Sequence, residues 1–260
     1  MKCKICTAET AFFAREKILQ KQVISYFKCD HCGFIQTEEP CWLKESYSHA
    51  INRSDVGLVT RNLSLAKITK CLIFTLFDKN ARFIDYGSGY GLLVRLMRDS
   101  GLDFYYYDKF CENILSPGFE ADTSCKTRYE LLTAFEVFEH LVNPLEEIEN
   151  MFSFSQDILF TTELLPINNP GPSEWWYYGL EHGQHISFYN LKTLKVIAQI
   201  YNMNVYSAGS VHLLSKRKIN KHLFTFLTKN YITNIISPLM IKKSLLQSDF
   251  IAFKSKLGRT

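Results

Sequence analysis

The residues with the clearest chemical meaning lie in a glycine-rich stretch, residues 82–93 (RFIDYGSGYGLL). Its first residues are apolar and indicate the end of a buried strand, and Asp85 stands where that strand stops. Glycines permit a tight turn and a close approach of a ligand to the backbone. The turn contains Gly87, Gly89 and Gly91.

An amphipathic helix is predicted after this turn, because Leu92, Leu93, Leu96 and Met97 recur at helical spacing. A ligand at the turn would meet the free N–H groups of that helix. The motif is neither G-x-G-x-x-G nor a P-loop with its lysine. The carboxylate of Asp85 argues against a phosphate and for an ammonium group. S-adenosylmethionine carries an ammonium group and no phosphate.

On this stretch the chain resembles the class I S-adenosylmethionine-dependent methyltransferases, whose first motif has this form. The resemblance implies an α/β fold, with a Rossmann-like, doubly wound sheet of seven strands. Asp108 supports it, because it ends the next predicted strand, residues 102–108, 23 residues after Asp85. A carboxylate there can accept hydrogen bonds from both ribose hydroxyls of the cofactor.

The resemblance also implies further cofactor contacts. Asp122 is expected at the adenine amino group, and Arg61 is expected to pair with the methionine carboxylate or to remain a surface arginine. The segment E-x-x-E-H-L, residues 136–141, is familiar from small-molecule methyltransferases. Phe135 and Glu136 are then expected to border the cofactor's sulfur, and Glu139 and His140 to hold the adjoining loop.

The long loop at residues 163–189 is rich in Pro, Gly, Trp and Tyr, which is typical of a substrate pocket at the carboxyl edge of a parallel sheet. It contains Glu181, His182 and His185. A histidine can act as the base for an alcohol or an acidic carbon. Metal binding and a purely structural anchor are the alternatives, and the sequence offers no clear third metal ligand beside this group.

Two C-x2-C pairs near the N-terminus, Cys3/Cys6 and Cys29/Cys32, have the spacing of a zinc ribbon. Alternating residues between them suggest a hairpin that joins two knuckles. Four thiolates around Zn²⁺ form a closed site, which favours a structural role over a catalytic one. His31 and Cys41 are expected not to be ligands.

The composition limits the class of protein. The net charge of +4 is too small to indicate nucleic-acid binding by itself. No apolar run reaches transmembrane length, and eight cysteines without a secretory signal are expected to be reduced thiols or metal ligands in a cytoplasmic protein. The oligomeric state cannot be inferred.

Three segments are expected: a zinc-ribbon-like unit (1–40), a helical linker that caps the cofactor (41–80) and the methyltransferase domain (81–260). Within that domain the later strands are expected at residues 117–122, 129–135, 155–162, 204–208 and 211–216. Residues 221–246 are expected to be helical, and residues 250–254 are predicted to form the last, antiparallel strand.

The expected reaction is methyl transfer from S-adenosylmethionine to a small molecule, such as a sugar, a nucleotide-linked sugar or a polysaccharide or secondary-metabolite precursor. Tyr47, Trp175, Trp176 and Tyr178 are expected to supply an aromatic pocket. Two alternatives remain at this point. One is an RNA methyltransferase whose zinc unit grips RNA, although no dense basic stripe is present. The other is a non-catalytic binding protein that retains the fold.

Overall fold

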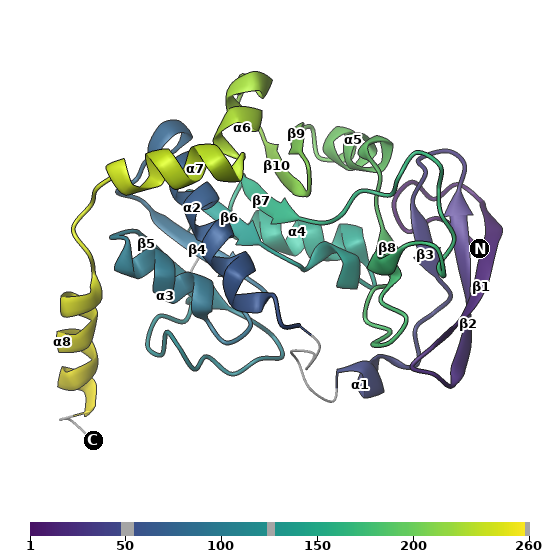
Figure 1. Ribbon diagram of the computed structural model, residues 1–260, viewed down its shortest axis with the longest axis horizontal. Helices are drawn as coiled ribbons and strands as arrows, with labels where there is room; N and C mark the ends of the chain where they lie inside the picture. The colour runs from purple at the N-terminus through teal and green to yellow at the C-terminus, as the bar shows by residue number, and fades with distance from the viewer. Residues whose placement is uncertain (48–54, 124–127, 258–260) are drawn as a thin grey trace. The chain divides into compact units, whose positions relative to one another are not determined.

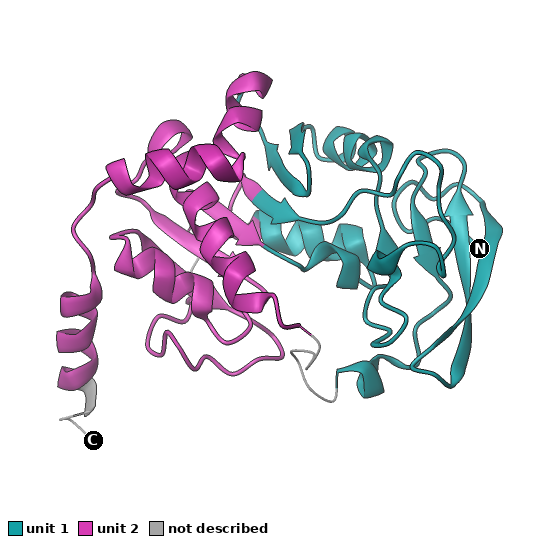
Figure 2. Ribbon diagram, in the orientation of Figure 1, with its two compact units in different colours: residues 1–52, 135–152, 159–218 teal, residues 53–134, 153–158, 219–260 magenta. Residues whose placement is uncertain are grey.

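The structure is a computed structural model that describes residues 1–47, 55–123 and 128–257. Residues 256 and 257 are described by their backbone alone. It divides into two compact units (Figures 1 and 2). Unit 1 comprises residues 1–52, 135–152 and 159–218, and unit 2 comprises residues 53–134, 153–158 and 219–260. Residues 48–54 of the expected linker lie outside the described residues.

Unit 2 contains three parallel strands in the order β5-β4-β6; β4 and β6 are largely buried, and β5 alternates between buried and partly exposed residues. They are β4 (Arg82–Tyr86), β5 (Asp103–Tyr107) and β6 (Leu131–Ala134). Phe83 of β4 and Phe104 of β5 stack with ring centroids 5.1 Å apart. Helix α3 (Leu92–Asp99) packs on β4 and β5, and α2 (Leu58–Leu76) packs against α3. The predicted unit of strand, glycine turn and helix is therefore confirmed.

Among the described residues, the larger sheet has six strands in the order β5-β4-β6-β7-β10-β9. Strand β7 is Ile158–Thr161, and β9 (Asn204–Ala208) and β10 (Val211–Ser215) form an antiparallel hairpin. The hairpin turns at Gly209, whose φ of +61° suits glycine. Helix α5 (Leu191–Ile200) packs on β9 and begins with a capping box between Asn190 and Thr193. The Rossmann-like α/β fold, with a mixed sheet, is confirmed.

Two predicted strands are wrong in detail. The expected third strand, residues 117–122, is reduced to one parallel bridge between Tyr106 and Glu120, so the described sheet has six strands rather than seven. Residues 250–254 belong to helix α8 (Leu246–Leu257) and are not a strand. The segment had the apolar content of a strand, but Leu246, Phe250 and Phe253 recur at helical spacing.

Helix α8 is held to helix α3, in the same unit, through Asp249, which is 6% exposed. Its carboxylate accepts from Arg98 Nη2 at 2.8 Å and from Arg95 Nη2 at 2.9 Å, and both arginines lie in α3. The preceding helices α6 (Lys221–Leu227), α7 (Asn230–Ile236) and η3 (Ser237–Leu239) replace the single helical stretch that the sequence suggested. α6 and α7 pack on α2.

The N-terminal residues form a second sheet within unit 1, in the order β1-β2-β3-β8. The hairpin of β1 (Thr10–Ile18) and β2 (Gln22–Cys29) confirms the predicted link between the knuckles. β3 (Ile35–Thr37) then pairs antiparallel with β8 (Ser187–Phe188), which belongs to the long aromatic loop. The expected division at residues 40 and 80 stays a prediction.

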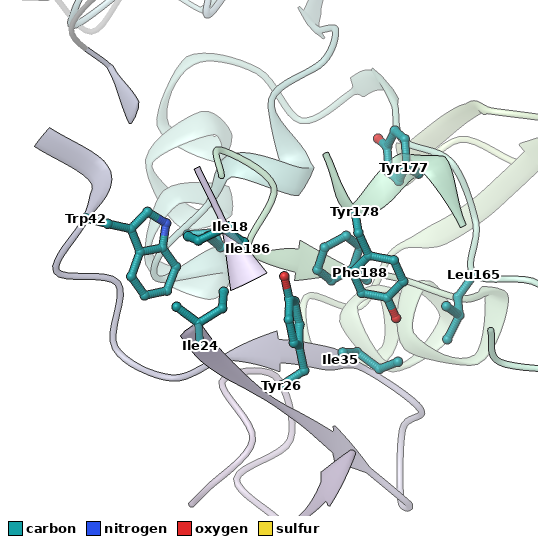
Figure 3. Packing of buried hydrophobic residues seen from close by; sticks show 10 residues of the cluster. All are labelled: Ile18, Ile24, Tyr26, Ile35, Trp42, Leu165, Tyr177, Tyr178, Ile186 and Phe188. Carbon is teal, nitrogen blue, oxygen red and sulfur yellow. The ribbon is translucent and has the colours of Figure 1, made fainter. Parts of the chain in front are cut away.

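One hydrophobic core joins this sheet to the aromatic loop (Figure 3). Tyr178 meets Tyr26 of β2 edge to face, with ring centroids 5.3 Å apart, and packs on Phe188 at 4.3 Å. Trp42 precedes α1 (Leu43–Ser46), and its indole N–H donates to the carbonyl of Gly183 at 2.8 Å. The loop is therefore anchored by aromatic side chains that the N-terminal sheet covers.

Two further elements of the chain carry or adjoin candidate residues: η1 (Phe138–His140) and α4 (Pro144–Phe154). A third, η2 (Trp176–Tyr178), lies within the aromatic loop. None of the helices in the described part of the chain combines the length and the apolar character needed to cross a membrane.

Candidate functional site

The glycine turn, residues 85–91, has the left-handed backbone that its sequence predicts. φ is +72° at Gly87, +56° at Gly89 and +84° at Gly91. A Cβ at Gly91 would lie 2.5 Å from Ser116 Oγ and 2.7 Å from Asn113 Oδ1, so this position has no room for a side chain. The turn is therefore a closely packed cradle that ends at the N-terminus of α3.

Asp85 is buried at the base of this turn, with 4% of its surface exposed. One carboxylate oxygen accepts from Ser88 Oγ at 2.6 Å, and the other accepts from Thr133 Oγ1 at 2.6 Å. Burial raises the pKa of Asp85 to about 6, although these two hydrogen bonds oppose the shift. Asp85 thus braces the turn against β6, and a contact with the cofactor's ammonium group stays a prediction.

Asp108 lies just after β5 and organises the backbone around it. Its Oδ2 accepts from Gly89 N at 2.9 Å, and its Oδ1 accepts from the N–H groups of Phe110 and Cys111 at 2.7 and 2.8 Å. A carboxylate has about four lone-pair sites, so one remains for a ligand hydroxyl. This geometry suits the predicted ribose contact.

Two other predicted cofactor residues of unit 2 have contacts elsewhere or face solvent. Arg61, on α2, forms an ion pair with Asp55 at 2.7 Å. Asp122 is exposed. Their cofactor roles stay predictions.

Glu136 follows Phe135 directly after β6, and both side chains are partly exposed within unit 1. The φ of Glu136 is +55°, which is uncommon for a residue with a side chain. Thr161 holds it in place: Thr161 Oγ1 accepts from the Glu136 N–H at 2.9 Å and donates to Glu136 Oε1 at 2.8 Å. Such backbone strain is concentrated at functional sites, which supports the importance of this position.

The two loop histidines predicted to be catalytic are joined by a third. The ring centroids of His182 and His185 are 4.8 Å apart, and those of His185 and His140 are 4.9 Å apart. We call these three residues the histidine cluster. The remaining predicted member, Glu181, is exposed, and its Oε1 is 4.0 Å from His182 Nε2. Glu181 therefore lies at the edge of the cluster and faces solvent.

Hydrogen bonds fix the tautomers of two of these rings. His140 Nδ1 is 3.1 Å from the carbonyl oxygen of Gln184, and His185 Nδ1 is 2.5 Å from that of Tyr177. A carbonyl can only accept, so each Nδ1 carries the hydrogen and each Nε2 carries a free lone pair. His182 is the opposite tautomer, because its Nδ1 accepts from the N–H of Gln184 at 3.1 Å.

Burial keeps this cluster uncharged. It lowers the pKa of His140 to about 4 and that of His185 well below its ordinary value. Burial also lowers the pKa of His182, and the carboxylate of Glu181 opposes that shift. Near neutral pH, His140 and His185 can accept a proton, bind a hydroxyl or ligate a metal through Nε2.

The aromatic residues expected to line a pocket lie in different surroundings. Tyr178 is fully buried in the core described above, so its assignment to a pocket is wrong. Trp176 is 75% exposed. The hydroxyl oxygen of Tyr47 is 3.0 Å from His140 Nδ1, which places Tyr47 beside the histidine cluster.

The four predicted cysteine ligands come together. The Sγ atoms of Cys3 and Cys32 are 3.5 Å apart, those of Cys6 and Cys29 are 3.4 Å apart, and all four lie within 4.8 Å of one another. Tetrahedral zinc with bonds of about 2.3 Å separates its sulfur ligands by about 3.8 Å. Gly33 follows with φ +76° and donates its N–H to the carbonyl of Cys29 at 2.7 Å. This group can hold a metal ion.

Sequence reasoning missed the chemistry of Glu139 and His140, which were expected only to hold a loop. They do so, because the carbonyl of Glu139 accepts from the N–H of Ile186 at 2.9 Å. In addition, their side chains meet His185, and one ligand atom from each of the three lies within 4.8 Å of the others. The E-H dipeptide was visible, but its distance of 45 residues from His185 concealed the contact.

Comparison with solved structures finds similarity to several methyltransferases at low identity. The plantazolicin methyltransferase BpumL, in complex with SAH, is 13% identical, with a TM-score of 0.48, covering 69% of this chain and 94% of that one. An O-methyltransferase family protein from Burkholderia thailandensis is 11% identical, with a TM-score of 0.47, and the match covers 66% of this chain and 61% of that one. Human N-acetylserotonin methyltransferase, in complex with SAM, is 14% identical, with a TM-score of 0.42, and the match covers 68% of this chain and 66% of that one.

The search of curated proteins found no match. The family model described as a methyltransferase domain matches residues 60–208, which is more than half of the chain and includes the glycine turn, Asp108 and the histidine cluster. The chain therefore belongs to the methyltransferase-domain family.

Proposed function

We propose that this methyltransferase transfers the methyl group of S-adenosylmethionine to a hydroxyl oxygen of a small sugar-type molecule. The observation that carries the proposal is the histidine cluster, in which His140 and His185 each donate Nδ1–H to a carbonyl and so keep the Nε2 lone pair available. A hydroxyl attacks a sulfonium methyl group more readily as its proton leaves, and an imidazole nitrogen within hydrogen-bond reach can accept that proton.

The transfer itself is a displacement in line. The bond between oxygen and the methyl carbon forms as the bond between carbon and sulfur breaks, and sulfur keeps the electron pair. The hydroxyl proton passes through the cluster to water. The protein contributes mainly by holding both partners, with reacting atoms about 3–3.5 Å apart.

The glycine turn is the proposed cofactor site of unit 2. The N-terminus of α3 and the remaining lone pair of Asp108 suit the methionine end and the ribose. Phe135, Glu136, Asp122 and Arg61 are proposed to complete the contacts. The support for Glu136 is its strained backbone, which Thr161 keeps in one conformation.

A sugar-type acceptor is supported by the exposed indole of Trp176, since an aromatic face can cover an apolar face of a sugar ring. His182, as an Nε2–H donor, can hold an acceptor oxygen. Glu181 is proposed to orient His182 from the solvent side. The proposed acceptor is therefore polar, with several hydroxyl groups.

We further propose that the four-cysteine group holds a structural Zn²⁺. A closed set of four thiolates leaves no open position for a substrate. The hydroxyl of Thr193 donates to the carbonyl of Cys32 at 2.9 Å, and Asn190 Nδ2 donates to that of Gly33 at 3.1 Å. The metal would thus stabilise the start of α5, which follows the aromatic loop.

The test begins with calorimetric titration of the purified, zinc-quantified protein with S-adenosylmethionine and its demethylated product. Nucleotide sugars and free sugars with hydroxyl groups are then incubated with the enzyme and the cofactor, and methylated products are detected by mass spectrometry. A methyl ether on a sugar oxygen supports the proposal. Methylation of RNA and of no small molecule would refute it, as would failure of the folded protein to bind the cofactor.

A further inference from the structure

A second group of metal-ligating side chains lies apart from the four cysteines and shares two residues with the histidine cluster. Glu139, His140 and His185 each offer one ligand atom, and these atoms lie within 4.8 Å of one another. The described residues contain no third group of this kind beyond this one and the cysteines. All three residues belong to unit 1.

The donor set has a recognisable preference. Two imidazole nitrogens and one carboxylate suit divalent first-row metals such as Mn²⁺, Fe²⁺ and Zn²⁺, and three protein ligands leave positions open for water or substrate. The four-cysteine group differs on both counts, because its ligands are soft thiolates and it is closed.

The hydrogen-bond partners of the two ligand histidines are those usual in metal sites. A metal-bound histidine usually donates its other ring N–H to a carbonyl, which fixes the ring and directs the free nitrogen. His140 and His185 both do this, through Gln184 and Tyr177. The hydroxyl oxygen of Tyr47 also lies 3.0 Å from the His140 Nδ1.

The backbone around the three ligands is held together by several hydrogen bonds. The N–H of Ile186, next to His185, donates to the carbonyl of Glu139 at 2.9 Å. Ser187 Oγ donates to the carbonyl of Leu141 at 2.8 Å, and the hydroxyl of Tyr189 donates to that of Phe138 at 3.0 Å. Segments 138–141 and 186–189 are therefore locked together, which keeps the ligands close at little further entropic cost.

Burial favours the same conclusion. The Glu139 side chain is fully buried. Buried charges in proteins are generally paired or coordinate metals, and a divalent cation would compensate the charge of this carboxylate. Bonds of about 2.0–2.2 Å require ligand atoms about 3–3.5 Å apart, which small rotations of the side chains provide.

We propose that Glu139, His140 and His185 bind a divalent first-row transition-metal ion, whose open positions take oxygens of the methyl acceptor. This inference rests on the proposed function and refines it: the metal occupies the Nε2 lone pairs of His140 and His185, and it replaces them in activating the acceptor, because a cation lowers the pKa of a hydroxyl bound to it so that the proton can pass to water. The acceptor would then be a molecule with two neighbouring oxygens, such as a vicinal diol of a sugar.

The test uses Mn²⁺, which prefers oxygen and nitrogen ligands and so avoids the four cysteines. The zinc-loaded protein is titrated with MnCl₂ while the signal of free Mn²⁺ is followed by electron paramagnetic resonance. One Mn²⁺ per chain is expected, with affinity at least about 10-fold weaker in His185→Gln and in Glu139→Gln. His222→Gln, on the exposed surface of α6, is the matched control and should bind as the wild type does.

A measurement on the wild-type protein covers the case in which the variants fail to fold. Bound Mn²⁺ broadens the nuclear magnetic resonance signals of nearby protons, so the ring protons of His140 and His185 should disappear before those of His222. Absence of a Mn²⁺ site, or broadening that leaves the cluster unaffected, would overturn the inference.

Activity separates this inference from the proposed function. Removal of the weaker metal with a mild chelator, with zinc retained, should reduce methyl transfer and leave the affinity for the demethylated cofactor unchanged. Full activity after removal would refute the metal site and leave the proposed function standing. Failure to bind the cofactor, with Mn²⁺ still bound, would refute the proposed function instead.

Discussion

In the glycine turn, the carboxylates of Asp85 and Asp108 are held by hydroxyl and N–H groups of the turn, of the residues that follow β5 and of β6. In the histidine cluster, by contrast, η1 contributes His140 and the aromatic loop contributes His182 and His185, with Tyr47 beside His140. The turn offers many N–H and O–H donors to charged groups, whereas in the cluster burial lowers the pKa of all three imidazoles and favours their neutral form. One region is thus suited to binding, and the other to handling a proton or a cation.

The largest expected effect tests the chemical role of the cluster. His185→Gln should lower kcat by about 100–10,000-fold, because a general base or the ligand of a catalytic metal contributes on this scale. The affinity for the demethylated cofactor, measured by calorimetry, should not change. His222→Gln serves as the control on the surface. An equal loss of cofactor affinity would mean that the two regions are not functionally distinct.

The next effect concerns the buried charge of the turn. The folded-state pKa of Asp85 is about 6, above its ordinary value of 3.8, so the folded state favours the protonated carboxyl. The contribution of Asp85 to the free energy of unfolding is therefore fully present below about pH 4 and is lost as the pH rises through about 6. The loss is at most about 3 kcal/mol. Asp85→Asn should therefore gain stability relative to the wild type across this interval, as measured by urea unfolding. A constant difference at all pH values would show that burial does not perturb Asp85.

Asp108→Ala tests whether the turn is a binding region. The variant should remain folded, and its affinity for S-adenosylmethionine should fall by about 10–100-fold, because three backbone N–H groups and the ribose hydroxyls lose their acceptor. Calorimetry provides the measurement. Asp99→Ala, an exposed carboxylate of the same unit, provides the control. Unchanged affinity in folded Asp108→Ala would remove the ribose assignment.

The smallest effect concerns the orientation of the cluster. Tyr47→Phe removes the hydroxyl beside His140 Nδ1 but leaves the contact with Gln184, so we expect a change of about 1 kcal/mol, or a few-fold in kcat. A pH profile of kcat would separate a positioning role, which shifts the profile, from simple packing, which does not. A loss as large as that in His185→Gln would give Tyr47 a direct role in the chemistry.

The same contrast explains how much could be predicted from the sequence. The glycine turn is a local pattern, so its strand, its helix and the position of Asp108 were all predictable from spacing. The four cysteines were predictable for the same reason, since each C-x2-C pair is a local knuckle.

The histidine cluster was predictable only in part. His182 and His185 stand in one segment, but His140 belongs to a different one, and only the fold brings it near. The aromatic loop contains four consecutive aromatic residues, 175–178, and no local pattern distinguishes the buried Tyr178 from the exposed Trp176. Residues 250–254 were predicted to form a strand from their apolar content, although Leu246, Phe250 and Phe253 have helical spacing; the ion pairs that hold this helix to α3 cannot be seen in sequence.

The pairing of β3 with β8 has a consequence for how the chain folds during synthesis. The ribosome makes the N-terminal hairpin early, but its sheet stays incomplete until residues 187–188 have been translated. Domains generally fold as units, starting from the N-terminus as the chain emerges. Here the first 40 residues must wait for about 150 more. A metal ion bound early by Cys3, Cys6, Cys29 and Cys32 would hold the two ends of the hairpin together during that interval.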